Sequence, residues 1–414
     1  MPPKRNQNRP KTRGKNSKEA VENPMADCIL PPDMMLCIMS RLPVKSLMRF
    51  KAVCKPWQKL VSNPKFIKIH HEQFSQGPKT CSVKSHLLTN LIIEPSKTIR
   101  GDPAEVFLDS CRGLVCLGRP LFSREIVLWN PATNMWKTLP HSKADFGTVE
   151  MVSLGFGCNA DDGDGGYDYK VVRIFGLKGK KVRTVVEVYS SKTDSWKTIQ
   201  VGFKFMVLYP TNHVIVNGNP YWIALIDENS RFVEGEECKV LLGFDCAKML
   251  FKIVPMPTLE VKGTFVDWKG SLGGVVCMMD ENDRLESIDV WAYDDGERVW
   301  RRNVSYEGLK LDADKCMDCS RSGKIVGSCM NGNFFIYDTE KNHLGIIDLK
   351  RDRRITFQIF PYEESLAFVQ GMKPMVVWKE EHRIENINII DGFFVSGLND
   401  PSGAEIGCYY PLAC

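Results

Sequence analysis

Cysteine and histidine are the residues of this 414-residue chain whose types suggest metal chemistry. Cys316 and Cys319 form the one C-x-x-C pair, and no second such pair or H-x(3–5)-H segment follows at zinc-finger spacing. His70 and His71 are adjacent at the predicted end of a helix, where we expect an exposed or capping pair. The cysteine count of 15 is odd and no secretory signal is present, so we expect reduced thiols, buried or at strand ends. These patterns predict no metal site and no cofactor.

Two glycine-rich segments resemble ligand-binding loops but lack the residues that complete them. Gly155-x-Gly157-x-x-Ala160 has the spacing of a dinucleotide fingerprint, yet Asp and Gly follow it where a helix should begin. The acidic residues of 161–166 are out of phase with a calcium loop, and the closing glutamate is missing. The patterns G-x-S-x-G and H-E-x-x-H are absent from the sequence. We therefore expect a protein without catalytic residues.

Charge is concentrated at the N-terminus. Residues 1–24 contain seven basic and two acidic side chains, which accounts for the net charge of +5, so the rest of the chain is formally neutral. This tail is predicted to be a disordered, solvated extension, with a nuclear-import signal or a nucleic-acid-contacting arm as alternatives. A neutral body indicates no specific nucleic-acid partner. The apolar runs fall short of the roughly 18 residues that span a bilayer, so we expect no membrane partner and a location in the nucleus, the cytoplasm or both.

The segment 25–70 has the apolar spacing of short helices bounded by prolines. An i, i+3, i+4, i+7 stripe precedes Pro43 and consists of Met35, Ile38, Met39 and Leu42. Two further short helices are predicted before Asn63-Pro64 ends the segment. About 40 residues bury too little surface to be stable alone, so a partner helix or the next domain should cover this three-helix bundle.

Residues 30–67 read LPPDMMLCIMSRLPVKSLMRFKAVCKPWQKLVSNPKFI, with Leu-Pro, a second Leu-Pro, Val-Cys-Lys-x-Trp and a terminal Phe in that order. This order resembles the F-box, which implies docking on a Skp-family adaptor and, through it, on the cullin and the RING subunit of a ubiquitin ligase. The landmarks near the chain entry and first turn are expected to face the adaptor: Leu30, Pro31, Leu42, Pro43 and Leu47. The others are expected inside the bundle: Ile38, Val53 and Trp57.

From about residue 83 the sequence is β-prone, and one unit recurs five times. Each copy has a strand, a polar turn and a second strand that opens with a large apolar residue. These opening residues are Trp136, Trp196, Phe251, Trp300 and Leu344. Their separations of 60, 55, 49 and 44 residues approach the roughly 40 to 50 of propeller blades. A further apolar run precedes each hairpin, so we predict about six four-stranded blades in a closed ring.

Three segments of the repeat region follow a second pattern: Cys111-Arg-Gly-Leu-Val-Cys, Leu128-Trp-Asn-Pro-Ala-Thr with its Trp136, and Leu154-Gly-Phe-Gly continued by Asp168-Tyr-Lys-Val-Val. They resemble the F-box-associated domain of plant F-box proteins, a relative of kelch-repeat substrate receptors. The resemblance implies a mainly β fold with a small all-α N-terminal module: a three-helix F-box at 25–70, then a β-propeller-like, kelch-related domain at 111–370. Residues 71–110 would be a linker and first strands. Residues 371–414 would be a C-terminal extension that packs against the ring or hangs free.

The two resemblances together imply a substrate-recognition subunit, not an enzyme, of a Skp–cullin–F-box ubiquitin ligase. It would bind an unidentified target protein for ubiquitination and proteasomal degradation. Target-binding residues are expected in polar loops at one mouth of the ring: 141–150, 159–166, 227–236 and 258–267. Two alternatives stay open: an F-box scaffold or competitor without ubiquitination, and a glycan-binding or enzymatic β-propeller in which the helical segment only packs.

Overall fold

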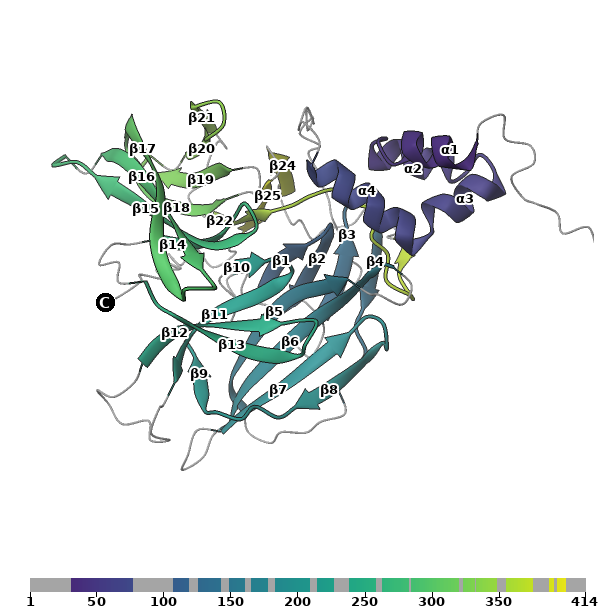
Figure 1. The fold of residues 1–414 in the computed structure, drawn as a ribbon, viewed down its shortest axis with the longest axis horizontal. Helices are drawn as coiled ribbons and strands as arrows, with labels where there is room; N and C mark the ends of the chain where they lie inside the picture. Colours follow the sequence, from purple (N-terminus) through teal and green to yellow (C-terminus); the bar gives the residue numbers. More distant parts are fainter. Residues whose placement is uncertain are drawn as a thin grey trace, which may run out of the picture.

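A mainly β fold follows a small helical module, as predicted, in the computed structural model of the chain (Figure 1). The tail 1–24, Leu30 and most of the predicted linker lie outside the described residues. No helix of the described part is long and apolar enough to cross a membrane. The structure describes residues 31–76, 107–118, 126–142, 149–160, 165–177, 183–208, 214–226, 238–257, 263–282, 284–319, 323–331, 333–347, 355–374, 387–390 and 393–399.

The helical module has four helices within 31–76, one more than predicted. They are α1 (Pro32–Met39), α2 (Val44–Phe50), α3 (Lys55–Val61) and α4 (Pro64–Gln76). Asn63-Pro64 ends α3, as expected, but it also begins α4. Proline is well suited to the first position of a helix because its missing N–H would have no helical partner there. The Asn63 side chain also accepts a hydrogen bond from Lys65 N at 2.9 Å, which caps the new helix.

The described strands form six sheets. The first contains β1 (Phe107–Cys111), β2 (Leu114–Gly118), β3 (Ile126–Asn130), β4 (Met135–Thr138) and β23 (Lys373–Pro374), and the second contains β5 (Val149–Ala160), β6 (Tyr167–Leu177), β7 (Arg183–Ser190) and β8 (Ser195–Ile199). The third contains β9 (Phe205–Val207), β10 (Val214–Val216), β11 (Asn219–Ile226), β12 (Cys238–Asp245) and β13 (Leu250–Pro255). The fourth contains β14 (Gly263–Trp268), β15 (Ser271–Met279), β16 (Leu285–Asp294) and β17 (Val299–Leu311). The fifth contains β18 (Ala313–Cys319), β19 (Lys324–Cys329), β20 (Phe334–Asp338) and β21 (His343–Ile347), and the sixth contains β22 (Ile355–Pro361), β24 (Ile387–Ile390) and β25 (Phe393–Asn399).

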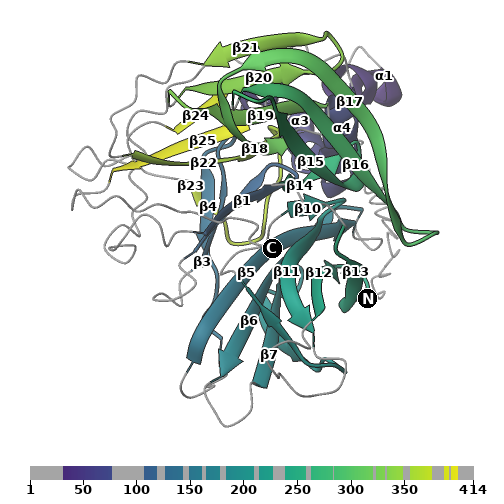
Figure 2. The ribbon, with the colours of Figure 1, turned by 90° about the vertical axis from the view of Figure 1, so that its left-hand side faces the viewer.

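These sheets close into a ring. The inner strand of each sheet lies beside that of the next, from β1 to β5, β11 and β10, β14, β18 and β22, and β22 lies beside β1 again. Figure 2 shows the sheets arranged around these inner strands. Five sheets have four or five described strands and the sixth has three, which agrees with the prediction of about six blades. Closure pairs or covers the inner edges that an open array would expose.

The unit that recurs in the sequence is the outer hairpin of the first five sheets, which joins the third strand to the fourth. In four of these hairpins, the side chain of the last residue of the third strand accepts hydrogen bonds from two N–H groups of the turn: Asn130, Asp245, Asp294 and Asp338. In all five, the residue just before the fourth strand has a positive φ: Asn134, Asp194, Met249, Arg298 and Asn342. These turns are therefore determined locally, by Asx hydrogen bonding and a left-handed residue.

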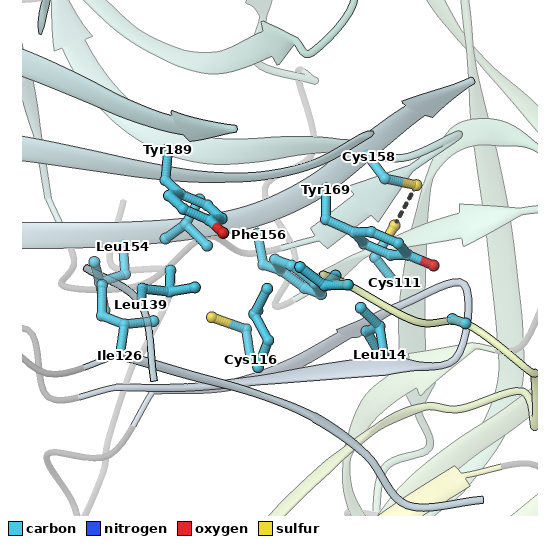
Figure 3. Packing of buried hydrophobic residues seen from close by; sticks show 14 of the residues in the cluster. Cys111, Leu114, Cys116, Ile126, Leu139, Leu154, Phe156, Cys158, Tyr169 and Tyr189 are labelled. Atoms are coloured by element: carbon cyan, nitrogen blue, oxygen red, sulfur yellow. Dashed lines mark hydrogen bonds between the residues drawn. The ribbon is translucent and has the colours of Figure 1, made fainter. Parts of the chain in front are cut away.

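A buried cluster between the first two sheets contains three of the cysteines, Cys111, Cys116 and Cys158 (Figure 3). Phe156 and Tyr169 stack with their ring centroids 6.1 Å apart. Cys111 Sγ lies 3.1 Å from Cys158 Sγ, and this hydrogen bond together with burial raises the pKa of the Cys111 thiol. Eight of the eleven described cysteines are buried, which confirms the expectation of buried thiols for this part of the chain. The described residues contain no group of three His, Cys, Asp or Glu side chains that could hold a metal ion.

The segment after residue 370 belongs to the ring. β23 pairs with β4, β25 pairs with β22, and β24 pairs with β25. Of the two alternatives left open for residues 371–414, the described strands therefore pack against the ring. The boundary predicted at 370 divides the sixth sheet, because β22 acquires its paired neighbour from the far side of that boundary.

Candidate adaptor-binding and target-binding surfaces

The helices of the F-box module share one apolar core with residues of the propeller domain. The buried helical members are Met35, Met39, Val44, Leu47, Val61 and Phe66. Leu366, which follows β22, is 4% exposed and belongs to the same cluster, and Ala132 of the first sheet packs against it. The expectation that the next domain covers the bundle is confirmed, because this small module reaches a closed core only with apolar side chains from the propeller.

The structure reverses the predicted orientation of three landmarks. Leu47, predicted to face the adaptor, is fully buried, whereas Ile38 and Val53, predicted to be internal, are 46% and 63% exposed. Helix phase explains the first helix: Met35 and Met39 lie one turn apart on its inner side, so Ile38, one residue earlier than Met39, is rotated by roughly 100° away from it. The apolar stripe in the sequence included both the inward-facing and the outward-facing residues of this helix, so periodicity alone did not show which residues are buried.

The other landmarks lie at the edges of the bundle. Pro31 and Pro43 are exposed, as predicted for residues that face an adaptor. Leu42 is half-buried against the core, and so is Trp57, whose ring lies 5.1 Å from that of Phe50. Adaptor contact by Pro31, Leu42 and Pro43 stays a prediction.

The outer side of α1 carries an exposed apolar surface that sequence reasoning missed in part. Met34 is 53% exposed and lies one turn before Ile38, and Cys37 beside them is also exposed. We call Met34, Cys37 and Ile38 the α1 face. The i, i+3, i+4 spacing of the three residues could have revealed it in the sequence. A contiguous apolar face on a helix end of a folded protein indicates an interaction site.

The adjacent histidines lie inside the module, not at its surface. His70 and His71 are buried in the middle of α4, so the expectation of an exposed or capping pair is wrong, because the chain continues as helix beyond them. His70 Nε2 donates to Leu42 O at 2.8 Å, and burial lowers the pKa of His70. His71 Nε2 lies 3.4 Å from the Glu363 carboxylate of the propeller domain. The pair therefore links α4 to the rest of the bundle and to the ring.

The helix α4 also rests on the second sheet. A Cβ on Gly165, in the β5–β6 turn, would lie 2.6 Å from Lys65 Cγ, so α4 passes close to this turn. The ring of Tyr167 packs edge-on against His71 at 6.0 Å between centroids, and the Arg112 guanidinium lies 5.0 Å from the same tyrosine ring. Burial at this junction raises the pKa of Tyr167 to about 12. The F-box module thus sits on one side of the ring, over the first and second sheets.

Strand alternation defines two sides of the ring. Neighbouring strands are antiparallel, so the first and third turns of each four-stranded sheet lie at the same end. First turns of adjacent sheets touch, as in the hydrogen bonds from Cys158 N to Gly218 O at 2.8 Å and from Asn217 Nδ2 to Gly270 O at 2.5 Å. Gly165 belongs to this end, which we call the F-box side. The second turns and the connections between sheets end on the opposite side, which we call the far side.

The predicted target-binding loops divide between these two sides. The strand ends that flank 141–150, 227–236 and 258–267 lie on the far side, whereas 159–166 contains the β5–β6 turn on the F-box side. The prediction of a single mouth is therefore wrong for 159–166, because this connection joins the first strand of its sheet to the second. Most residues of the other loops lie outside the described part, and their contact with a target stays a prediction.

The described far side carries two exposed methionines that sequence reasoning missed. Met278, at the end of β15, is 38% exposed, and Met330, after β19, is 65% exposed. Met330 N donates to Asp312 O at 2.9 Å, so the connection between the fourth and fifth sheets lies directly beside it. Methionine side chains adapt their shape to a partner, and exposed methionines are typical of protein-binding surfaces.

A small helical module of the F-box type on one side of a closed β-propeller defines the class of protein. Comparison with known families identifies the family to which the chain belongs. The F-box domain family matches residues 28–69, and the family described as F-box associated beta propeller domain matches residues 68–389. The chain belongs to the F-box proteins with an F-box associated β-propeller domain. This membership supports, in general terms, a role as substrate receptor of a Skp–cullin–F-box ligase, with a Skp-type adaptor as partner.

Similar proteins are found in Arabidopsis thaliana. An F-box/kelch-repeat protein of this plant is 26% identical over 356 residues, which cover 78% of this chain and 93% of that protein. The F-box protein CPR1 is 29% identical over 302 residues, or 63% of this chain and 68% of that protein. Among solved structures, YjhT aligns with 59% of this chain and 97% of its own at 9% identity and a TM-score of 0.32. The relatives support a plant F-box protein.

Proposed function

We propose that the chain is the target-recognition subunit of a Skp–cullin–F-box ubiquitin ligase. The F-box would bind a Skp-family adaptor and, through it, the cullin and the RING subunit. The propeller would hold a target protein for ubiquitination and proteasomal degradation. The observation that carries the proposal is the exposed α1 face, Met34, Cys37 and Ile38, on the F-box of a chain whose described far side exposes Met278 and Met330.

The proposed contribution to catalysis is proximity, with no covalent step on this chain. An adaptor bound at the F-box and a target bound at the far side would be carried by one folded body. Target lysines would then meet the charged conjugating enzyme in an effectively intramolecular reaction. Met278 and Met330 are the described residues that we assign to the target-binding surface, together with the far-side loops.

Binding of the purified full chain to a recombinant Skp adaptor tests the proposal. Met34→Asp and Ile38→Asp together should abolish binding, because both side chains are exposed and two charges would have to be desolvated in the interface. Leu250→Asp is the matched control, since Leu250 is 62% exposed on the propeller and should leave binding unchanged. No adaptor binding by the folded native chain would refute the function, and binding by the double variant would refute the role of the α1 face.

Two alternatives are decided by further measurements. An F-box scaffold or competitor would bind the adaptor but leave the half-life of its partner unchanged when the proteasome is inhibited. A glycan-binding or enzymatic propeller would bind no adaptor.

The proposed location, nucleus or cytoplasm or both, is tested by imaging a fluorescent fusion of the full chain beside one that lacks residues 1–24.

A further inference from the structure

The segment that follows β22, residues 362–372, lies between the F-box and the ring. We call it the strap. The first sheet holds its backbone: Asn130 Nδ2 donates to Ser365 O at 3.0 Å and to Ala367 O at 2.8 Å. The Ser365 hydroxyl donates to Arg112 O at 3.0 Å. The Asn130 side chain is fully buried, so losing these bonds would leave buried polar groups without their partners.

The side chains of the strap point in two directions. Ala367, Val369 and Met372 belong to the core between the first two sheets. Leu366 belongs to the core of the F-box instead, among the buried residues of its helices. A single stretch of chain thus contributes apolar side chains to both domains at once, although nearly 300 residues separate it from the F-box in the sequence.

Two further contacts restrict movement of the strap. The Glu363 carboxylate lies 3.4 Å from His71 Nε2 of α4. On the other side, a Cβ on Gly113 would lie 2.0 Å from Ser365 Oγ, and Gly113 has a φ of +81°, so only glycine permits this approach of the strap to the β1–β2 turn. The strap is therefore in close contact with the ring below it and with α4 above it.

We propose that the strap fixes the orientation of the F-box relative to the propeller and that Leu366 is its positioning residue. Leu366 would act through the F-box core, without touching adaptor or target. A fixed orientation restricts which lysines the ligase can reach, because the effective concentration of a lysine depends on the geometry of the body that carries it. This consequence for ubiquitin transfer rests on the proposed function, whereas the orientation itself does not.

The first test measures the orientation in the purified full chain without adaptor, because a label on Cys37 occupies the α1 face to which the adaptor would bind. Spin labels are placed on Cys37 and Cys238, which are exposed on the F-box and on the propeller. Serine replaces Cys54, Cys28, Cys81, Cys408 and Cys414. Pulsed EPR then gives the distribution of distances between the two labels.

Leu366→Ala is compared with Val369→Ala, which truncates a buried residue of the same strap that faces the ring. Leu366→Ala should widen the distribution by about twofold or more as the F-box samples further orientations, while adaptor affinity changes by less than about twofold. Val369→Ala and Leu366→Met should keep the distribution of distances narrow. A narrow distribution for Leu366→Ala, or equal widening in Val369→Ala, would overturn the proposal. Should Leu366→Ala fail to fold, Glu363→Gln takes its place, and an unchanged distribution then counts against the strap.

The second test follows ubiquitin transfer to the chain's own lysines in a reconstituted ligase with cullin, RING subunit and conjugating enzyme. The native chain and Val369→Ala should be modified at the same restricted set of lysines, and Leu366→Ala at a broader set. The same set in Leu366→Ala would refute the consequence for transfer. If the native chain binds no adaptor, the proposed function fails, and if it binds adaptor but receives no ubiquitin, the consequence for transfer fails. The distance measurement still decides the role of the strap in both cases.

Discussion

Replacing Leu47 with alanine should lower the free energy of unfolding of the F-box module. Leu47 is fully buried among the helical core residues of the F-box. The substitution removes three buried carbon groups at about 0.8 kcal/mol each, which is roughly 2.4 kcal/mol. The cavity left behind adds to this loss, so we expect about 3 kcal/mol, within the 2 to 5 found for such truncations. Ile38→Ala removes a side chain that is 46% exposed and should cost about 1 kcal/mol or less.

Amide hydrogen exchange of peptides within 31–76 of the full chain is the appropriate assay, because a chain of two domains does not unfold as one unit. A loss of about 3 kcal/mol predicts roughly 100-fold faster exchange of the core amides in Leu47→Ala. Ile38→Ala should leave exchange near the native rate and weaken adaptor binding. The reasoning would be refuted if Leu47→Ala exchanged like the native chain and yet lost the adaptor, since Leu47 would then be a contact residue.

Three further outcomes follow from the described residues. Gly218→Ala should lower the melting midpoint by at least about 2 °C in calorimetry, because Gly218 has a φ of +81° and a Cβ would lie 2.2 Å from Cys158 O; an unchanged midpoint would contradict the close approach. Burial lowers the pKa of His70 below its ordinary 6.5, partly opposed by a backbone hydrogen bond, so its contribution to stability is complete above that pH and is lost as the pH falls below it. Denaturant unfolding between about pH 7.5 and 5.5 should show this slope, and His70→Asn should flatten it. Cys37 and Cys238 should be alkylated in the native protein, while the buried thiols should react only after unfolding, as measured by mass spectrometry. Rapid alkylation of the buried thiols in the native protein would show instead that the ring opens.

The outer hairpins of the ring could be predicted from the sequence because their determinants are local. Each copy contains its turn and the apolar residue that opens the fourth strand within about a dozen residues. Asn130 and Asp245, for example, hydrogen-bond to the turn that directly follows them. The helix boundaries at prolines could also be predicted, except at Pro64. The sequence predicted that Asn63-Pro64 ends a helix, but Pro64 also begins α4.

Which side of a helix faces inward could not be predicted in the same way. Periodicity placed Ile38 in an apolar stripe with Met35 and Met39, but the choice of inner residues depends on what packs against the helix. In the structure the neighbouring helices and Leu366 select Met35 and Met39, which leaves Ile38 outside. The burial of His70 and His71 has the same origin, because it requires α4 to lie on the ring.

The sequence by itself determined the class of this protein, its F-box landmarks and the repeating hairpins, since these depend on residue order and on contacts between near neighbours. Only the tertiary structure decided the closure of β22 on β1, the pairing of β25 with β22, the separation of far-side from F-box-side loops, and the insertion of Leu366 into the F-box core. The closure of the ring and the Leu366 contact join segments that lie more than 200 residues apart. Their partners are selected by shape and burial in three dimensions, for which spacing along the chain carries no signal.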